Sequence, residues 1–532
     1  MYSANVMIHA ATNTTTGFVY ADRRMGTMMD IKGLGLEHGL SGIKHLEPCR
    51  PPPFGKSGSV HRADRVSLAP MRVSDRSTSR YIPGPWVVVL FAFAVILWIG
   101  GGASRADVFG QPLVRAAAWT CLALVVLFGT TRPVRSARPV LLLLTGASLI
   151  AAIQLVPLPP GLWQSLPGRS LYNGTEAALA GPAVWRPLAI VPSTAWNALG
   201  SLIVPFVMWC LMTRVRGVGD KHFLLLLLGL VLAGMGMGML QFAGIPLHDP
   251  LVNGGGEVSG TFANHNHFAL MMACGIALVP VWVFLDGRSP GWRAPVAVGL
   301  VLFLALSIVA SGSRAGTLAG IVALGCGLLM VRRPLRRTLA PYPKWVLPAL
   351  IAAFITIVVG VVILSIVADR ALSINRAMTI DPGQDMRHRA LPTVLSMIRE
   401  YFPFGAGLGS FDTVFRAHEP FNLLKPTFFN RAHDDFLEIV LDTGLAGATL
   451  LLAGFGWWLW ASVRAWRAGP GADTLLARLG SVLVLLVMAA SVVDYPARTP
   501  MIMALLVIAG VWLDGIPRRA DASALPESAE HL

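Results

Sequence analysis

The chain has 532 residues, of which 54% are hydrophobic and only 13% are charged, and its formal net charge is +15. Soluble domains carry roughly a quarter charged residues, so this composition excludes a single soluble core. The positive charge does not indicate a nucleic-acid-binding protein, because most Lys and Arg residues lie in short connections beside apolar blocks.

Residues 1–83 are polar, basic and punctuated by glycine and proline, and they contain no apolar signal-peptide region. This composition predicts a disordered cytoplasmic tail without chemistry of its own. Alternatively, the native chain begins at Met71, shortly before the first apolar block. Residues 84–194 are expected to hold the first transmembrane helices and a first outside loop, and residues 516–532 a cytoplasmic C-terminal tail.

Apolar blocks of about 17–25 residues dominate the chain between the two tails, and this is the length that a helix needs to cross a hydrocarbon core. They predict an all-α fold, a polytopic transmembrane bundle of about twelve helices. The predicted spans are 85–102, 114–130, 139–157, 196–213, 222–242, 267–286, 295–311, 315–331, 344–367, 436–462, 477–493 and 499–514.

The orientation of the bundle follows from its basic residues. When the N-terminal tail is placed inside, every inside connection is basic, as the positive-inside rule expects, and both termini are cytoplasmic. The basic residues of these connections are Arg132, Arg135, Arg138, Arg214, Arg216, Lys221, Arg288, Arg293, Arg332, Arg333, Arg336, Arg337, Lys344, Arg464, Arg467, Arg478, Arg518 and Arg519.

The outside segments are then 158–195, 243–266, 311–314, 368–435 and 494–498. The longest two, 158–195 and 368–435, both lie on this face, and long connections in compact bundles are commonly functional. We expect the second to contain short helices.

The apolar cores of the predicted helices contain almost no Asp, Glu, Lys or Arg. Ion-coupled transporters need ionisable groups near mid-membrane, where they carry the proton or bind the ion. The pattern therefore favours a site at the outer membrane boundary over transport. Four cysteines inside apolar segments are interpreted as small core side chains without disulfide or metal-binding spacing: Cys121, Cys210, Cys274 and Cys326.

The first polar cluster on the outside is 260–269 (GTFANHNHFA), directly before a predicted helix. Alternating amides and imidazoles at a helix N-terminus can bind sugar hydroxyls, and the helix end favours an anion. The structural alternative is a capped helix start, with Asn264 or Asn266 as the N-cap, and local physics favours it. His265 and His267 have no third ligand at a familiar spacing, so no metal is expected.

The second cluster is the outside turn 311–316 (SGSRAG), in which Arg314 is an isolated charge. An arginine at the outer rim beside a helix N-terminus can bind a diphosphate, because its planar fork pairs with phosphate oxygens. The structural alternative is an interfacial arginine that extends toward water. An outside arginine is less expected from the positive-inside rule, which leaves the two interpretations even.

The third cluster lies in the long loop, where Arg387 and Arg389 precede a predicted short amphipathic helix at 390–400. The helix dipole disfavours cations there, which indicates an anionic ligand. The glycines of 401–411 (YFPFGAGLGSF) permit close backbone approach, but this pattern is more often just a turn.

The fourth cluster, 432–438 (AHDDFLE), lies where the chain re-enters the membrane. Asp434, Glu438 and Asp442 are spaced to share one helical face, with His433 beside them. A histidine near carboxylates is a candidate general base for a hydroxyl acceptor. Complementation of the helix dipole explains Asp434 and Asp435, but Glu438 and Asp442 are costly near lipid unless they face a wet cavity.

The four clusters, and their order along the chain, resemble the motifs of the O-antigen ligase and O-antigen polymerase superfamily. The resemblance covers roughly 195–515, with the long loop 368–435 inside it, and Asp494-Tyr495-Pro496 is similar to a further marker of the family. The family commonly has Asn after its histidine, whereas this chain has Asp434, which removes support for an amide there.

The resemblance implies a metal-independent, inverting glycosyltransferase of the bacterial inner membrane, without a cofactor and with a periplasmic active site. Its implied donor is a glycan on undecaprenyl diphosphate, and its acceptor is a hydroxyl group. Mapped onto this chain, the diphosphate-binding arginines are Arg314 and Arg387 or Arg389, and the histidine is His433. Asn264, Asn266, Asp434 and Glu438 are expected to bind glycan or acceptor or to shape the site.

Three enzymatic readings remain open, and they differ in their acceptor. The leading one is a ligase that transfers the glycan to lipid A–core; the others are a polymerase that joins repeat units and an oligosaccharyltransferase that modifies protein. The alternative from another class is a non-catalytic polysaccharide exporter or flippase, which predicts buried charges and repeat symmetry that are not seen.

Overall fold

The computed structural model describes residues 84–515, except 106, 131, 173–183, 248, 253–257, 288, 368–385 and 425–428. Both predicted tails, 1–83 and 516–532, lie outside the described residues. The long helices are α1 (Pro85–Gly100), α2 (Gly110–Phe128), α3 (Arg138–Ile153), α6 (Pro192–Ser201), α7 (Ile203–Thr213), α8 (Asp220–Phe242), α9 (His265–Phe284), α10 (Arg293–Ser311), α11 (Arg314–Met330), α13 (Val346–Val367), α15 (Met386–Tyr401), α17 (Asp435–Arg467), α18 (Ala472–Ser491) and α19 (Pro500–Asp514). The short elements are α4 (Pro160–Ser165), α12 (Arg332–Leu339), α16 (Phe411–His418), η2 (Phe421–Leu423) and η3 (Pro496–Arg498).

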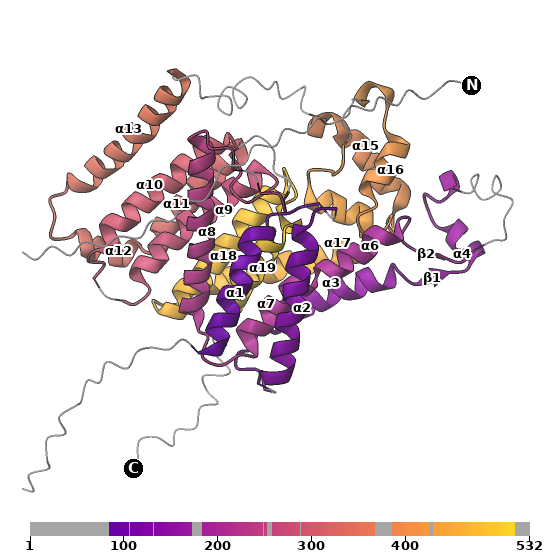
Figure 1. The fold of residues 1–532 in the computed structure, drawn as a ribbon, viewed down its shortest axis with the longest axis horizontal. Coiled ribbons are helices and arrows are strands. Elements are labelled where there is room, and N and C mark those ends of the chain that lie inside the picture. The colour runs from indigo at the N-terminus through magenta and orange to yellow at the C-terminus, as the bar shows by residue number, and fades with distance from the viewer. Residues whose placement is uncertain are drawn as a thin grey trace, which may run out of the picture. The chain divides into compact units, whose positions relative to one another are not determined.

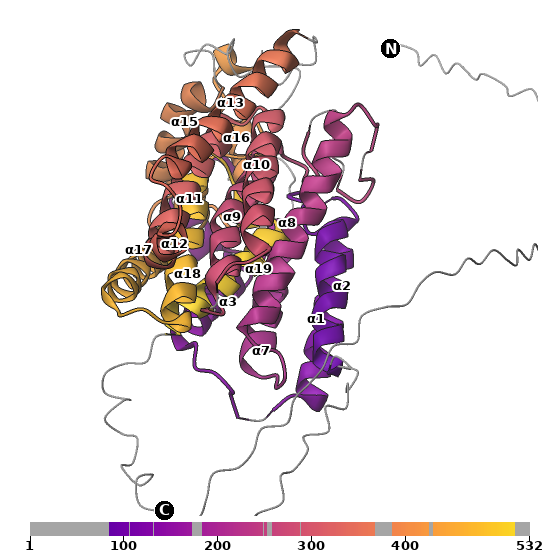
Figure 2. The same ribbon diagram turned by 90° about the vertical axis from the view of Figure 1, so that its left-hand side faces the viewer.

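Each of the predicted apolar segments is helical, and the helices form a bundle (Figures 1 and 2). Seven helices of the described chain are long and apolar enough to cross a membrane, or up to eight if the bent pair α11 and α12 forms one span. The helices α1, α3 and α19 and the apolar part of α13 are shorter. The predicted transmembrane character is thus confirmed, while the number of about twelve spans stays a prediction.

The strands β1 (Pro157–Leu158) and β2 (Arg186–Pro187) are the only departure from the predicted all-α fold in the described residues. They pair antiparallel and close the base of the first long loop, where Trp163 Nε1 donates to the Pro187 carbonyl oxygen at 2.9 Å.

The core of the bundle is built around α9, which packs against α8, α10, α11 and α18. Within the apolar stretch of α9, 83% of the residues are buried, because neighbouring helices surround it. A helix that is apolar all round is stable only in such a position or in lipid. The N-termini of α9, α11 and α17 and the turn between α18 and α19 lie at one end of this core, beside the loop helices α15 and α16 (Figure 1).

The two long loops contact each other at that end. The Ile190 amide donates to the Ala406 carbonyl oxygen at 2.9 Å, and Arg169 Nη2 donates to the Leu188 carbonyl oxygen at 2.7 Å. Arg169 is fully buried, with its guanidinium over the rings of Trp163 and Tyr401. Burial lowers the pKa of Arg169 to about 10, which still leaves it cationic at neutral pH.

The helix α17 is broken near its start, where the sequence predicts an uninterrupted span. Gly444 adopts φ 60° and ψ −139°, outside the helical region. The break frees the Leu445 amide, which donates to the Pro403 carbonyl oxygen at 2.8 Å. The short segment before Gly444 therefore belongs structurally to the loop, and the rest of α17 to the bundle.

Replacing Gly444 with alanine is expected to destabilise the fold by about 2 kcal/mol or more, because the backbone is left-handed there and a Cβ would overlap the Pro403 carbonyl. Thermal unfolding of the purified protein in detergent would measure the loss. Gly456→Ala is the matched control, since that glycine of α17 has open space around its Cβ position. Equal unfolding midpoints for the two variants would contradict this account.

Candidate functional site

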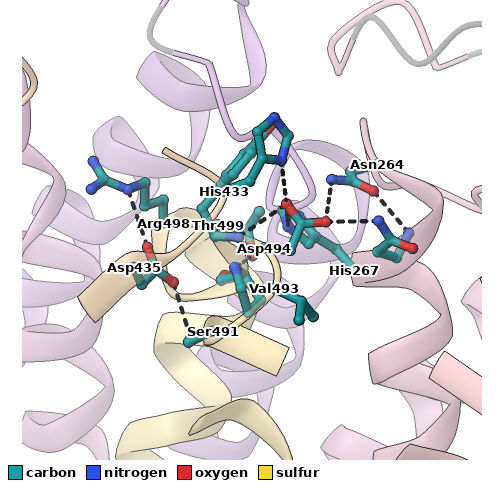
Figure 3. Close-up of polar contacts among 12 residues, drawn as sticks. Asn264, His267, His433, Asp435, Ser491, Val493, Asp494, Arg498 and Thr499 are labelled. Atoms are coloured by element: carbon teal, nitrogen blue, oxygen red, sulfur yellow. Dashed lines mark hydrogen bonds and ion pairs between the residues drawn. The ribbon is translucent and has the colours of Figure 1, made fainter. Parts of the chain in front are cut away.

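Asp494 lies at the centre of a polar cluster at this end of the bundle (Figure 3). It stands in the turn between α18 and α19 and is only 2% exposed. His433 Nδ1 lies 3.2 Å from Asp494 Oδ1. The structure thus pairs a histidine from the exit of the long loop with a carboxylate 61 residues later in the chain.

Both predicted asparagines donate to the other oxygen of this carboxylate. The Nδ2 atoms of Asn264 and Asn266 lie 2.9 and 2.8 Å from Asp494 Oδ2. Asn264 is also the N-cap of α9, because its Oδ1 accepts the Asn266 amide at 2.8 Å. The cap and the cluster use different atoms of Asn264, since the cap uses its oxygen and the bond to Asp494 its nitrogen. The role of Asn264 in binding glycan or acceptor stays a prediction.

Asn266 connects the cluster to the start of α11. Its Oδ1 accepts a hydrogen bond of 2.7 Å from Ser313 Oγ, and the same Oγ accepts the Gly316 amide at 3.0 Å as the N-cap of α11. Arg314, exposed, is the next residue and opens α11. The predicted arginine therefore stands one residue from a side chain that is bonded into the cluster.

The two loop arginines lie in the first turn of α15, but they have different partners. Arg387 Nη1 donates to the Val493 carbonyl oxygen at 2.8 Å, and its Nη2 lies 3.9 Å from Asp494 Oδ2. Arg389 Nη2 donates instead to the Asn422 carbonyl oxygen at 2.6 Å, within the loop. The Arg387 side chain thus reaches the Asp494 cluster, whereas the Arg389 side chain is bonded within the loop.

Asp494 is held in its ionised form. Burial raises the pKa of a carboxyl group, but the hydrogen bond from His433 and the charges of His267, His433 and Arg387 outweigh it and hold the pKa of Asp494 well below its usual range. An ionised carboxylate only accepts hydrogen bonds, so the bond at 3.2 Å requires a proton on His433 Nδ1, and Nε2 is the ring nitrogen that does not face Asp494. Within the described part of the chain, no protein group is hydrogen-bonded to Nε2.

The backbone at His433 is unusual for a residue other than glycine, since its φ is 53°. Aromatic rings hold the imidazole on two sides, with the centroids of Phe429 and Tyr495 at 5.3 and 5.0 Å. Left-handed residues of this kind are strained and cluster at functional sites. The side chain remains 18% exposed, so the imidazole is reachable from outside.

Asp434 does not share a helical face with Glu438 and Asp442, contrary to the expectation from spacing. It is the N-cap of α17, and its Oδ1 accepts the Leu437 amide at 2.9 Å. The spacing argument fails because the cap residue is extended rather than helical. Burial raises the pKa of Asp434, which is consistent with a cap away from compensating cations.

Glu438 does not face a wet cavity either. It is fully buried, and its Oε1 pairs with Arg431 Nη1 and Arg498 Nη2, both at 3.0 Å. Buried charges persist in proteins when they are paired in this way. The sequence predicted a water-filled cavity because burying the charged Glu438 side chain costs free energy. Two arginines outside the helix offset that cost instead.

The glycines of 401–411 lie close to the backbone of the protein itself, as expected if this segment is a turn. Gly405, Gly407 and Gly409 all have left-handed φ values, of 82°, 104° and 75°. The Gly407 amide donates to the Asp442 carbonyl oxygen at 2.8 Å, and the Gly409 amide to Asp442 Oδ2 at 2.9 Å. These residues fasten the long loop to the break in α17, which places His433 at the loop's exit.

Sequence reasoning missed the central position of Asp494 and the participation of Ser313 and Arg498. The sequence did contain a hint of the role of Asp494, because this residue belongs to the outside segment 494–498 and to the family-like motif Asp494-Tyr495-Pro496. For Arg498 the only signal was its position in the same segment. Among the described residues, no group of three or more His, Cys, Asp and Glu side chains is arranged to hold a metal ion.

The fold and this cluster define a multi-pass membrane protein with a buried polar site at one end of its helices. Residues 299–452 match the model of a protein family described as O-antigen ligase. The match confirms the resemblance to the O-antigen ligase-related superfamily, whose members are glycan-transferring membrane enzymes. It contains Arg314, Arg387 and His433, whereas Asn264 and Asp494 lie outside the matched residues. No curated protein matches the chain.

Proposed function

We propose that this protein transfers an undecaprenyl-diphosphate-linked glycan to a hydroxyl acceptor at the periplasmic face of the inner membrane, as an O-antigen ligase-like enzyme. The observation that carries the proposal is the His433–Asp494 pair. An ionised, buried carboxylate 3.2 Å from Nδ1 orients the imidazole and leaves Nε2 available as a base at the exposed edge of the cluster.

In the proposed reaction, Nε2 of His433 takes the proton of the acceptor hydroxyl as the acceptor oxygen bonds to the anomeric carbon of the glycan. The bond between that carbon and the diphosphate oxygen breaks, and undecaprenyl diphosphate leaves. Attack from the face opposite the leaving group inverts the anomeric centre. Asp494 stabilises the imidazolium that forms, without itself taking the proton.

Arg314 and Arg387 are assigned to the donor diphosphate. The leaving group gains negative charge as the glycosidic bond breaks, and guanidinium groups stabilise such charge most strongly where water is partly excluded. Arg387 borders the cluster, and Arg314 follows Ser313, which is bonded to Asn266. Arg389 was expected to share this role, but its bond to the Asn422 carbonyl favours a role in holding the loop.

The periplasmic location rests on the distribution of charge in the sequence. The cluster residues fall in segments that the positive-inside rule places outside, whereas α12, with its exposed arginines at 332, 333, 336 and 337, follows the opposite end of α11. A lipid-linked donor in the outer leaflet would present its diphosphate at the cluster's end of the bundle.

Arg314→Ala is expected to raise the KM for the donor by about 10-fold or more, because a charge-assisted contact to phosphate is lost. Steady-state kinetics with purified lipid-linked donor would measure the change. Arg399→Ala is the matched control, since Arg399 is an exposed arginine in the last turn of α15. An unchanged donor KM for Arg314→Ala would remove this residue from the donor site.

The acceptor can be identified by reconstituting the full chain with undecaprenyl-diphosphate glycan and, in parallel, with lipid A–core, unlinked repeat units or acceptor protein. Glycosylated lipid A–core identifies a ligase, which is the expected result. Laddered lipid-linked chains would identify a polymerase, and modified protein an oligosaccharyltransferase. Lipid translocation without turnover of any acceptor would overturn the enzymatic proposal in favour of an exporter or flippase.

A further inference from the structure

A second buried cluster of charges lies beside the His433–Asp494 pair and is not used by the reaction proposed above (Figure 3). Arg498 Nε lies 3.2 Å from Asp435 Oδ1, and its Nη2 lies 3.0 Å from Glu438 Oε1. Both carboxylates are almost completely buried, at 3% and 0% exposed. We call Arg498, Asp435 and Glu438 the clamp.

The clamp joins the two chain segments that supply the catalytic pair. Arg498 stands four residues after Asp494 in the turn between α18 and α19. Asp435 and Glu438 are the first and fourth residues of α17, directly after His433 and its neighbour. One guanidinium therefore ties the turn that carries Asp494 to the helix start that carries His433.

The same carboxylates also hold the backbone on both sides of the pair. Glu438 Oε2 accepts the amide of Ala432 at 2.9 Å, immediately before the left-handed His433. Asp435 Oδ2 accepts the amide of Ala497 at 3.3 Å and the hydroxyl of Ser491 at 3.0 Å, on either side of Asp494 in sequence. The clamp thus restrains the main chain at His433 and the main chain around Asp494 together.

Stability alone is a poor reason for such a cluster. Ion pairs in the interior lose much of their attraction to desolvation, and apolar side chains of similar volume often stabilise a fold as well. In some proteins, buried polar or ionic groups instead fix one arrangement of the segments that they join. The planar fork of arginine, which reaches two carboxylates at once, suits this role better than a lysine ammonium.

We propose that Arg498 is a positioning residue, which fixes Asp494 against His433 Nδ1 by clamping the α18–α19 turn to the start of α17. The kinetic part of this proposal rests on the function proposed above. In the proposed reaction Arg498 bonds to Asp435 and Glu438 rather than to the donor or acceptor, so it acts on the rate of the chemical step through Asp494.

The test is a double-mutant cycle with Arg498→Lys and Asp494→Asn in the full-length protein, measured as single-turnover rates with saturating donor. Arg498→Lys keeps the charge but loses the fork, and it is expected to lower the rate by about 10- to 100-fold while the donor KM stays within about 2-fold. In the Asp494→Asn background, the same change is expected to cost less than about 3-fold, because the residue it positions is already impaired. Arg416→Lys, which alters an exposed pair with Asp412 on α16, is the matched control and should leave the rate unchanged.

Two kinetic results would overturn the proposal. An unchanged rate for Arg498→Lys would show that the clamp is not needed for the pair. Equal fold-losses in the two backgrounds would show that Arg498 acts independently of Asp494, as a general structural residue does.

A spectroscopic measurement separates this proposal from the proposed function. In protein labelled with ¹⁵N-histidine, the Nδ1 proton of His433 should give a downfield resonance that disappears in His433→Ala, weakens in Arg498→Lys and persists in Arg416→Lys. Weakening of that signal in Arg498→Lys without turnover of any glycan donor by the wild type would refute the proposed function and support the clamp. A signal of wild-type intensity in Arg498→Lys would overturn the clamp whether or not the protein is a transferase.

Discussion

Replacing His433 with alanine is expected to lower kcat by about 10²- to 10⁴-fold, the range that a general base contributes. The donor KM should change little, since the imidazole contacts the acceptor hydroxyl rather than the diphosphate in the proposed reaction. Single-turnover transfer with saturating donor would measure the loss.

The matched control is His418→Ala in α16. His418 also pairs with a carboxylate, because its Nε2 lies 2.9 Å from Glu400 Oε2, but this pair belongs to the loop and does not contact the Asp494 cluster. We expect it to retain the wild-type kcat. A robust wild-type rate that persists in His433→Ala would show that the base is another residue.

Asp494→Asn is expected to lower kcat by a similar factor, about 10²- to 10⁴-fold, although the side chain keeps its shape. The neutral amide no longer stabilises the imidazolium, and its nitrogen can donate to His433 Nδ1 and so reverse the tautomer. It also competes with the two asparagine amides that donate to Oδ2. Asp412→Asn on α16 serves as the control, and equal rates for the two variants would contradict a catalytic role for Asp494.

The pH dependence of stability provides a separate check on Asp494. Because its folded pKa is depressed, its interactions stabilise the protein above the unfolded pKa of about 4 and are lost as the pH falls through the folded pKa. The difference in unfolding free energy between wild type and Asp494→Asn should therefore shrink as the pH falls below about 4. A difference that grew on acidification would contradict an ionised Asp494.

Much of the bundle could be predicted because a membrane span is a local property of the sequence. A block such as 267–286 needs only its own length and apolarity to form α9. The break at Gly444 could not be predicted in this way. It depends on the Pro403 carbonyl, which the folding of the long loop brings to that point.

The candidate site was predictable in part for the same reason. The helix starts at Asn264, Arg314 and His433 have recognisable local signals, and the alternation of basic connections places them on one face. The contacts of Asn264 and His433 with each other's segments depend on Asp494, which comes from the α18–α19 turn and bonds to both over long sequence distances. Arg314 is connected to them only through its neighbour Ser313, which donates to Asn266. Arg389 shows the reverse case, since it stands beside Arg387 in the sequence but points to Asn422.

In the proposed reaction, His433 activates the acceptor while Arg314 and Arg387 stabilise the departing diphosphate. The most direct test follows the release of undecaprenyl diphosphate by ³¹P NMR in proteoliposomes that contain glycan donor, with and without acceptor. We expect release to require acceptor, to equal the amount of glycosylated product and to be lost in His433→Ala while donor binding is retained. Release at the wild-type rate in His433→Ala, or glycosylated product without release of the diphosphate, would contradict the proposed reaction.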